Sequence, residues 1–236
     1  MGQLLSSSKA RLSEATSEAT SRAAQETAAS SEADVYADGA AAAYDADAEG
    51  LRLFEVQLGV LREQAWWPAP DAGGLVSLDY GCGPARLLCG LGDALAPGSC
   101  GLDPSESMLE LARSRAADAG LRDVVDFRNL DPAQEGAELE SFAGKADLVI
   151  VCFVMYFVDD KEKIFGHLCR SLKSGGHLFV AEYENDVPQA KLETWTSAWG
   201  CRIASTLPEE MLIADIDEKF KINIFVVEKV ADQALN

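Results

Sequence analysis

One short segment of this sequence has the residue types and spacing to hold a nucleotide-like ligand. The segment LDYGCGPA (78–85) lies between an apolar, strand-like run and a helical stretch. Gly81 and Gly83 allow the backbone to turn tightly and allow a ligand to approach main-chain atoms. A strand, a glycine turn and a helix in this order form the junction at which α/β folds bind nucleotides.

A carboxylate ends the next strand-like run, SCGLD, at Asp103. At that place a carboxylate can accept hydrogen bonds from both hydroxyls of a ribose. The dinucleotide fingerprint G-x-G-x-x-G needs a third glycine where this chain has Arg86. The bulky arginine disfavours a pyrophosphate, and Asp79 suits a ligand with an ammonium and a sulfonium better than a diphosphate.

Strand-like and helical stretches alternate through the rest of the chain. The strand-like runs are LVSLDY, SCGLD, VVDFRN, ADLVIVCFV and HLFVAEY, and helical patterns separate them. This alternation predicts βαβ units and a parallel sheet with both faces buried. The runs CRIAST and FKINIFVVEK follow a last helix, and no helix follows the second of them. We therefore predict an α/β fold whose last two strands form a hairpin-like edge.

Four segments taken together resemble the class I S-adenosylmethionine-dependent methyltransferases. They are LDYGCGPARLL, GLDPSESMLELAR, ADLVIVCFVMYFVDD and LKSGGHLFVAEYE, and the resemblance runs from about residue 75 to residue 229. It is greatest to the small-molecule branch that includes ubiquinone-biosynthesis-like enzymes. The resemblance implies a Rossmann-like, seven-strand, mostly parallel sheet with an antiparallel last strand and helices on both faces. It also implies S-adenosyl-L-methionine as the cofactor and a small-molecule substrate.

The same resemblance implies roles for individual residues. The cofactor-binding residues would be Asp79, Gly81, Gly83, Asp103, Met108, Asp131, Cys152 and Phe153. The first three would line the methionine end of the cofactor and the fourth would hold the ribose. Met108 would pack near the adenine, Asp131 would meet its amino group, and the last two would end the fourth strand beside the cofactor. The chain departs from the family in two places, since Ala85 replaces a common third glycine and NLDP replaces the commoner G-D-A.

Candidate substrate and catalytic residues lie at strand ends and before the domain. Related enzymes place a lid where Tyr36 and Tyr44 lie. Trp67 could form an aromatic wall over the substrate or anchor the preceding helix in the core. Glu182 and Tyr183 end the fifth strand, and Glu182 and Tyr156 are the catalytic candidates.

The two histidines and six cysteines point to chemistry without a metal or a histidine base. No C-x-x-C pair occurs, so a Cys/His zinc site is not expected. His177 begins a strand, at the end away from the expected site, and His167 lies within a helix. An oxygen acceptor usually needs a base, so a nitrogen or sulfur acceptor is favoured over oxygen.

The chain divides into four predicted parts. Residues 1–34 form a disordered extension rich in Ser, Thr, Ala and Glu; residues 35–70 form a helical lid, with one helix expected from Tyr36 to Trp67. Residues 71–230 form the methyltransferase domain and residues 231–236 a tail.

The net charge of −19 argues against nucleic acid as a partner, because such a surface repels phosphates. No apolar stretch is long enough to span a bilayer and no signal-peptide core is present, so we expect a cytoplasmic protein with reduced thiols. The start MGQLLS fits N-myristoylation of Gly2 in a eukaryote. A single acyl chain would give only weak membrane association, because Lys9 and Arg11 are too few to form a basic patch.

Two other classes of function stay open from the residues alone. A protein with this fold could hold the cofactor or a partner without catalysis, although Asp79, Gly81, Gly83 and Asp103 are all present. A methyltransferase of protein side chains is the second alternative.

Overall fold

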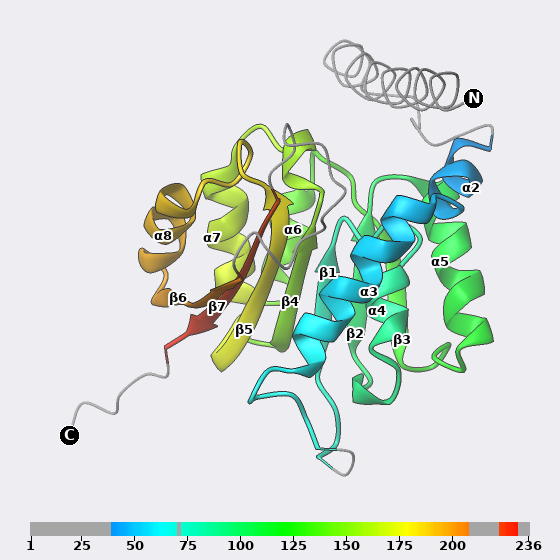
Figure 1. Ribbon diagram of the computed structural model, residues 1–236, viewed down its shortest axis with the longest axis horizontal. Helices are drawn as coiled ribbons and strands as arrows, with labels where there is room; N and C mark the ends of the chain where they lie inside the picture. The colour runs from blue at the N-terminus through cyan, green and yellow to red at the C-terminus, as the bar shows by residue number, and fades with distance from the viewer. Residues whose placement is uncertain (1–38, 70–71, 208–221, 231–236) are drawn as a thin grey trace, which may run out of the picture.

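Seven strands form one sheet in the computed structural model, which describes residues 39–69, 72–207 and 222–230 (Figure 1). The strands are β1 (Ser77–Tyr80), β2 (Ser99–Asp103), β3 (Val125–Asn129), β4 (Ala146–Cys152), β5 (Leu172–Tyr183), β6 (Cys201–Leu207) and β7 (Ile222–Lys229). Their order across the sheet is β3-β2-β1-β4-β5-β7-β6. β1 to β5 are parallel, and β7 runs antiparallel to both β5 and β6. The predicted α/β fold and its antiparallel edge are confirmed.

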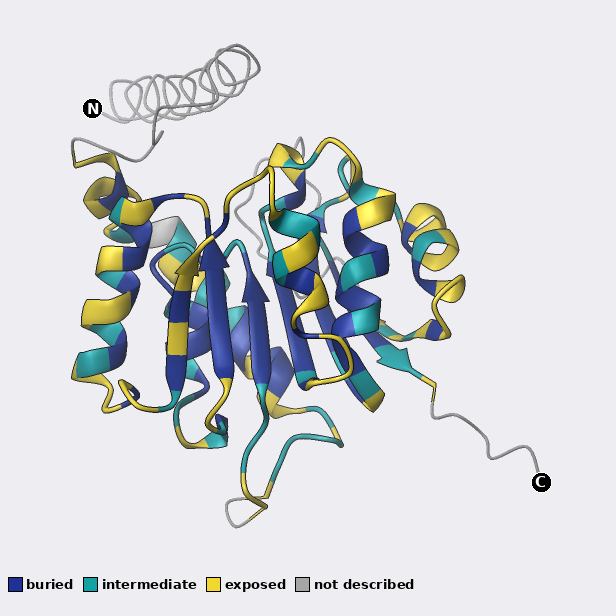
Figure 2. Ribbon diagram, turned by 180° about the vertical axis from the view of Figure 1, so that it is seen from behind, coloured by how far each residue is buried: buried dark blue, intermediate teal, exposed yellow. Residues whose placement is uncertain are grey.

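Helices cover both faces of the sheet. The α-helices are α2 (Ala40–Asp45), α3 (Ala48–Arg62), α4 (Arg86–Gly90), α5 (Glu106–Asp118), α6 (Glu135–Glu140), α7 (Lys161–Ser171) and α8 (Gln189–Ser197), and two 3₁₀ turns are η1 (Gly92–Ala94) and η2 (Met155–Phe157). One apolar cluster joins α3, α4 and α5 to one face, and a second joins α6, α7 and α8 to the other. The central strands are buried along most of their length (Figure 2).

Alternation along each strand decides which cluster a side chain joins, because neighbouring side chains point to opposite faces. Leu78 and Tyr80 of β1 belong to the α7 side, so Asp79 points to the α3 side. On β5, Phe179 and Ala181 belong to the α3 side, and Tyr183 packs against the same cluster. The parallel strands direct their carboxyl ends to one edge, where ligands of such sheets bind.

The segment before the sheet is two helices instead of the single helix expected from Tyr36 to Trp67. The carboxylate of Asp47 accepts a hydrogen bond from the N–H of Gly50 (2.7 Å) and caps the start of α3. Aspartate is a preferred residue at this position, so it begins a new helix after α2. α3 ends at Arg62, and residues 63–69 continue as turns. Within the described ranges, no helix has the length and apolarity needed to cross a bilayer.

Candidate functional site

The glycine turn after β1 is fixed by hydrogen bonds to the end of β2. The N–H groups of Gly81 and Cys82 both donate to the carbonyl of Leu102, at 2.8 and 2.9 Å. The N–H of Gly83 donates to Asp103 Oδ2 at 2.8 Å. Three successive amides of the turn are therefore bound by the protein itself. A phosphate would need such amides free, so the turn is not built as a phosphate cradle.

Asp103 connects the glycine turn to the start of α5. Its second oxygen, Oδ1, accepts from the N–H of Ser105 at 2.9 Å, and the Ser105 hydroxyl accepts from the N–H of Met108 at 3.2 Å. The Asp103 side chain is buried. Each carboxylate oxygen has more than one acceptor position, so Asp103 can also accept from a pair of ligand hydroxyls.

Asp79 is a second buried carboxylate on the same side of the sheet. Burial, and to a smaller extent the charge of Asp103, raises the pKa of Asp79 to about 8. Burial also raises the pKa of the Cys82 and Cys152 thiols, and the negative charge of Asp79 adds to it. These thiols are therefore neutral at physiological pH. Two buried carboxyl groups on one side of the sheet favour a ligand with positive charge over a diphosphate.

The loop after β4 packs directly on the glycine turn. A Cβ added to Gly81, which has φ +72°, would lie 2.3 Å from Val154 Cγ2. Phe153 has φ +53°, in the left-handed region that non-glycine residues rarely adopt, and its N–H donates to the carbonyl of Ala181 at 3.0 Å. Its ring lies 5.3 Å from the ring of Tyr183. The structure thus places two predicted site residues, Phe153 and Tyr183, in contact.

Glu182, a predicted catalytic residue, lies on the opposite face from Asp79 and Tyr183. Its Oε1 accepts from the N–H groups of Val154 (2.7 Å) and Met155 (3.0 Å), and the side chain is fully buried. Burial raises the pKa of Glu182 to about 7. The carboxylate therefore lies beneath the β4 loop and is not part of the group around Asp79, which corrects its expected place at the reacting atoms.

Other aromatic candidates lie on or near the carboxyl edge. Tyr156 in η2 is 41 % exposed and meets Phe157 edge-to-face at 5.2 Å. Tyr44 is the next-to-last residue of α2 and is 48 % exposed, whereas Tyr36 lies outside the described residues. Their substrate and catalytic roles stay predictions.

Trp67 lies away from this edge, and its contact with substrate stays a prediction. Trp66 stacks on His177 with ring centroids 4.2 Å apart, and Trp67 lies 6.4 Å from Trp66. His177 pairs with Leu148, which itself pairs with Ser77 at the amino end of β1. Both tryptophans pack against the α3-side core, so they anchor the chain after α3.

Met108 and Asp131 lie beside the end of β2 and after β3. Met108 is buried in the first turn of α5. Asp131 is exposed, and its two oxygens accept from the N–H of Ala133 (2.8 Å) and the side chain of Gln134 (3.3 Å). Its carboxylate thus serves the local turn, and the adenine roles of Met108 and Asp131 stay predictions.

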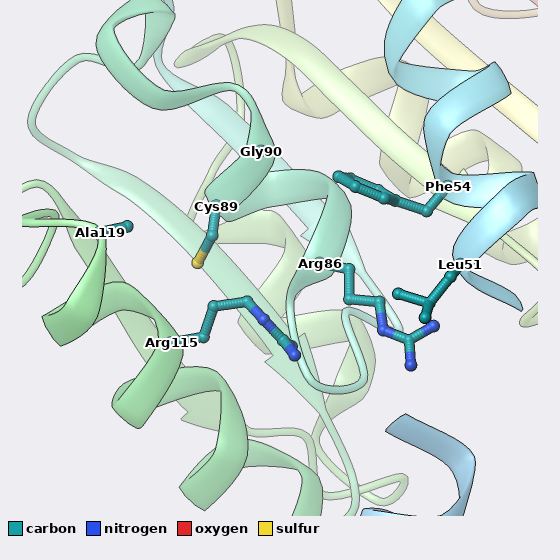
Figure 3. Close-up of a pocket in the computed structure, with 7 residues that line it drawn as sticks. All are labelled: Leu51, Phe54, Arg86, Cys89, Gly90, Arg115 and Ala119. Atoms are coloured by element: carbon teal, nitrogen blue, oxygen red, sulfur yellow. The ribbon is translucent and has the colours of Figure 1, made fainter. Parts of the chain in front are cut away.

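The carboxylate of Asp45 in α2 pairs with Arg86 and Arg115 beside the glycine turn, and we call these three residues the carboxylate latch. The sequence analysis did not predict it. Arg86 Nε lies 2.8 Å from Asp45 Oδ1, and Arg115 Nη2 lies 2.8 and 2.7 Å from the two Asp45 oxygens. Arg115 also donates to the carbonyl of Pro84 in the turn. Both arginines line a pocket between α3, α4 and α5 with Leu51, Phe54, Cys89, Gly90 and Ala119 (Figure 3). The residue that departs from the dinucleotide fingerprint, Arg86, therefore holds α2 to the domain.

The fold and the site together define a Rossmann-like nucleotide-binding class with two buried carboxyl groups beside its glycine turn. Residues 71–224 match the family described as "Methyltransferase domain", and the chain belongs to this family. The domain is that of the class I S-adenosylmethionine-dependent methyltransferases, and its cofactor is S-adenosylmethionine.

Three known proteins show how far the similarity extends. The chain is 32 % identical over 107 residues to polyketide synthase ThaQ of Burkholderia thailandensis, covering 45 % of this chain and 5 % of that protein. It is 32 % identical over 119 residues to a ubiquinone biosynthesis O-methyltransferase of Sinorhizobium medicae, covering 50 % of this chain and 45 % of that protein. The chain thus spans less than half the length of these two relatives. Magnesium protoporphyrin IX methyltransferase (ChlM) from Synechocystis PCC 6803 shares the fold, with a TM-score of 0.58 and 21 % identity over 77 % of this chain and 80 % of that one.

We predict that Gly81→Ala is far more damaging than Gly83→Ala. Both glycines have positive φ, so an alanine is strained at either position, but only at Gly81 would the new Cβ collide with Val154. Overpacking of this kind typically costs about 1–3 kcal/mol. Urea unfolding should show this difference between the variants, and calorimetry should show weaker S-adenosylmethionine binding for Gly81→Ala. Equal effects of the two substitutions would contradict the packing of the β4 loop on the turn.

We predict that Asp79 makes the protein less stable as pH rises. The pKa of Asp79 is raised to about 8 from an ordinary 3.8, so between these values the folded protein retains a proton that the unfolded chain loses. The free energy of unfolding should therefore fall from pH 4 towards pH 8. Asp79→Asn should reduce this dependence by at least about 1.4 kcal/mol, the equivalent of one pKa unit, and the remainder should include the smaller contribution of Glu182, whose pKa is raised to about 7. The control is Asp118→Asn on exposed helix surface, which should leave the pH dependence unchanged.

Proposed function

We propose that this protein transfers a methyl group from S-adenosylmethionine to a small molecule, with a nitrogen or sulfur atom as the favoured acceptor. The observation that carries the proposal is the pair of buried carboxylates, Asp79 and Asp103, beside a glycine turn whose amides are already bonded. This arrangement suits a ligand with a ribose and positive charges and does not suit a diphosphate.

The chain's own groups would bind and orient the ligands. Asp103 would accept from the ribose hydroxyls, and Asp79, once ionised, would balance the ammonium of the methionine part. Phe153 and Tyr183 would wall the pocket at the ends of β4 and β5 and exclude water. When bound, the cofactor would supply a methyl group already activated by its sulfonium. The protein's main tasks would then be to position the two reactants and to provide a favourable electrostatic field.

The positions of the histidines support an acceptor that needs no histidine base. His167 Nδ1 lies 2.6 Å from Arg170 and 3.6 Å from Glu140, between α7 and α6. His177 stacks on Trp66 near the amino edge of the sheet. Burial lowers the pKa of both histidines. An amine or a thiolate would be nucleophilic without either of them, whereas an alcohol would need a base.

Binding of S-adenosylmethionine to Asp103 variants tests the cofactor site. Removing a charge-assisted hydrogen-bonding pair costs about 1.5–3 kcal/mol, so Asp103→Ala should lower affinity roughly ten- to a hundredfold at 1.4 kcal/mol per decade. Asp103→Asn keeps one carbonyl acceptor and should lose less. Calorimetry measures both affinities, and thermal unfolding confirms that each variant is folded, since Asp103 also binds Gly83 and Ser105. A folded Asp103→Ala protein with wild-type affinity would rule out the ribose role.

The acceptor class is tested with methyl-labelled cofactor and a cell extract separated by molecular size. Label in the small-molecule fraction supports the proposal. Label in the protein fraction identifies a protein side-chain methyltransferase instead. Tight cofactor binding without transfer to any fraction, in an extract of the source organism, indicates a cofactor-holding protein.

We predict that the double variant His167→Asn/His177→Asn retains turnover within about tenfold of wild type, because neither imidazole lies at the carboxyl edge and a general base typically contributes 10²–10⁴-fold. Turnover should be measured with the acceptor found above, alongside cofactor affinity. A thousandfold loss in a variant that folds and binds cofactor normally would show that a histidine base takes part.

A further inference from the structure

A buried carboxylate on the far side of the sheet has contacts that packing alone does not explain. Glu182 is fully buried, and its Oε1 accepts from two successive amides, those of Val154 and Met155. Among the residues that the structure describes, its Oε2 has no hydrogen-bond partner. Its strand neighbours Leu178 and Val180 belong to the apolar cluster on the α7 side. A carboxylate in such surroundings carries a desolvation cost that an apolar side chain would avoid.

The two amides that Glu182 binds belong to the loop that touches the glycine turn. Val154 lies against Gly81 so closely that no Cβ fits between them. The preceding residue, Phe153, is held in the left-handed region and packs on Tyr183. The following residues form η2, which carries the exposed Tyr156. The position of this one loop therefore sets the contact with the glycine turn and the places of Phe153 and Tyr156.

We propose that Glu182 is a positioning residue, which holds the loop 153–155 against Gly81 and so fixes the pocket wall for the cofactor. This inference rests on the proposed function. It adds a residue that acts on the site from the opposite face of the sheet. One oxygen that accepts from both amides fixes the loop at two successive points. The strained φ of Phe153 needs such support to persist.

Three substitutions separate a positioning role from a role of charge. Glu182→Gln keeps the chain length and a carbonyl that can accept both amides, but has no charge. Glu182→Asp keeps the charge but is one methylene too short to reach both amides from the same backbone position. Glu182→Met keeps the volume and removes the acceptor. The matched controls are Glu184→Gln and Glu184→Met, two residues further on at an exposed position.

The measurements are S-adenosylmethionine affinity by calorimetry and amide hydrogen exchange of residues 153–157 by mass spectrometry, each with a thermal unfolding curve. We expect Glu182→Gln to bind within about threefold of wild type. Glu182→Asp and Glu182→Met should bind at least tenfold more weakly and exchange the loop amides faster, while the Glu184 variants resemble wild type.

The outcomes distinguish this inference from the proposed function. If wild type does not bind S-adenosylmethionine, the proposed function fails, and with it the functional role assigned to Glu182. If wild type binds and Glu182→Asp binds equally well with unchanged loop exchange, positioning by Glu182 is overturned. If Glu182→Asp binds normally and Glu182→Gln does not, the carboxylate acts through its charge. If Glu182→Met does not fold, the relative cofactor affinities of Glu182→Gln and Glu182→Asp still distinguish positioning from charge.

Discussion

The end of β2 holds the glycine turn of β1, and the rest of the site depends on this contact. The Leu102 carbonyl and the Asp103 carboxylate take the three amides of residues 81–83. With those amides bound internally, the turn presents no free donors to a phosphate. Beside it lie the carboxyl groups of Asp103 and of the buried Asp79, whose ionised forms a positively charged ligand would favour. The same backbone turn that grips a pyrophosphate in other α/β proteins is thereby suited to a ligand with positive charge.

Most of the fold was predictable because its evidence is local. Strands buried on both faces must be continuous apolar runs, and the runs that end at Asp103, Cys152 and Tyr183 are of this kind. The break between α2 and α3 was not predicted, although its signal is present. Asp47 is a good helix cap, but it lies among alanines and acidic residues that read equally well as one continuous helix.

The site was predictable only where motif and strand end coincide. Asp79 and Asp103 were identified because the glycine turn marks their positions. Glu182 and Tyr183 could not be told apart in this way, since a shift of one residue reverses the face on which a strand side chain lies. The contact of Val154 with Gly81 joins positions more than seventy residues apart in the sequence, and no local pattern marks such a pair.

The latch of Asp45 with Arg86 and Arg115 has a thermodynamic consequence for the docking of α2. Because Arg115 also binds the Pro84 carbonyl, docking of α2 and the shape of the glycine turn share the same guanidinium groups. Coupling between two such events is reciprocal. If a ligand in the pocket strengthens the docking of α2 by some factor, docking strengthens that ligand's affinity by the same factor. Any modification or partner that draws α2 away would then weaken ligand binding without contacting the ligand.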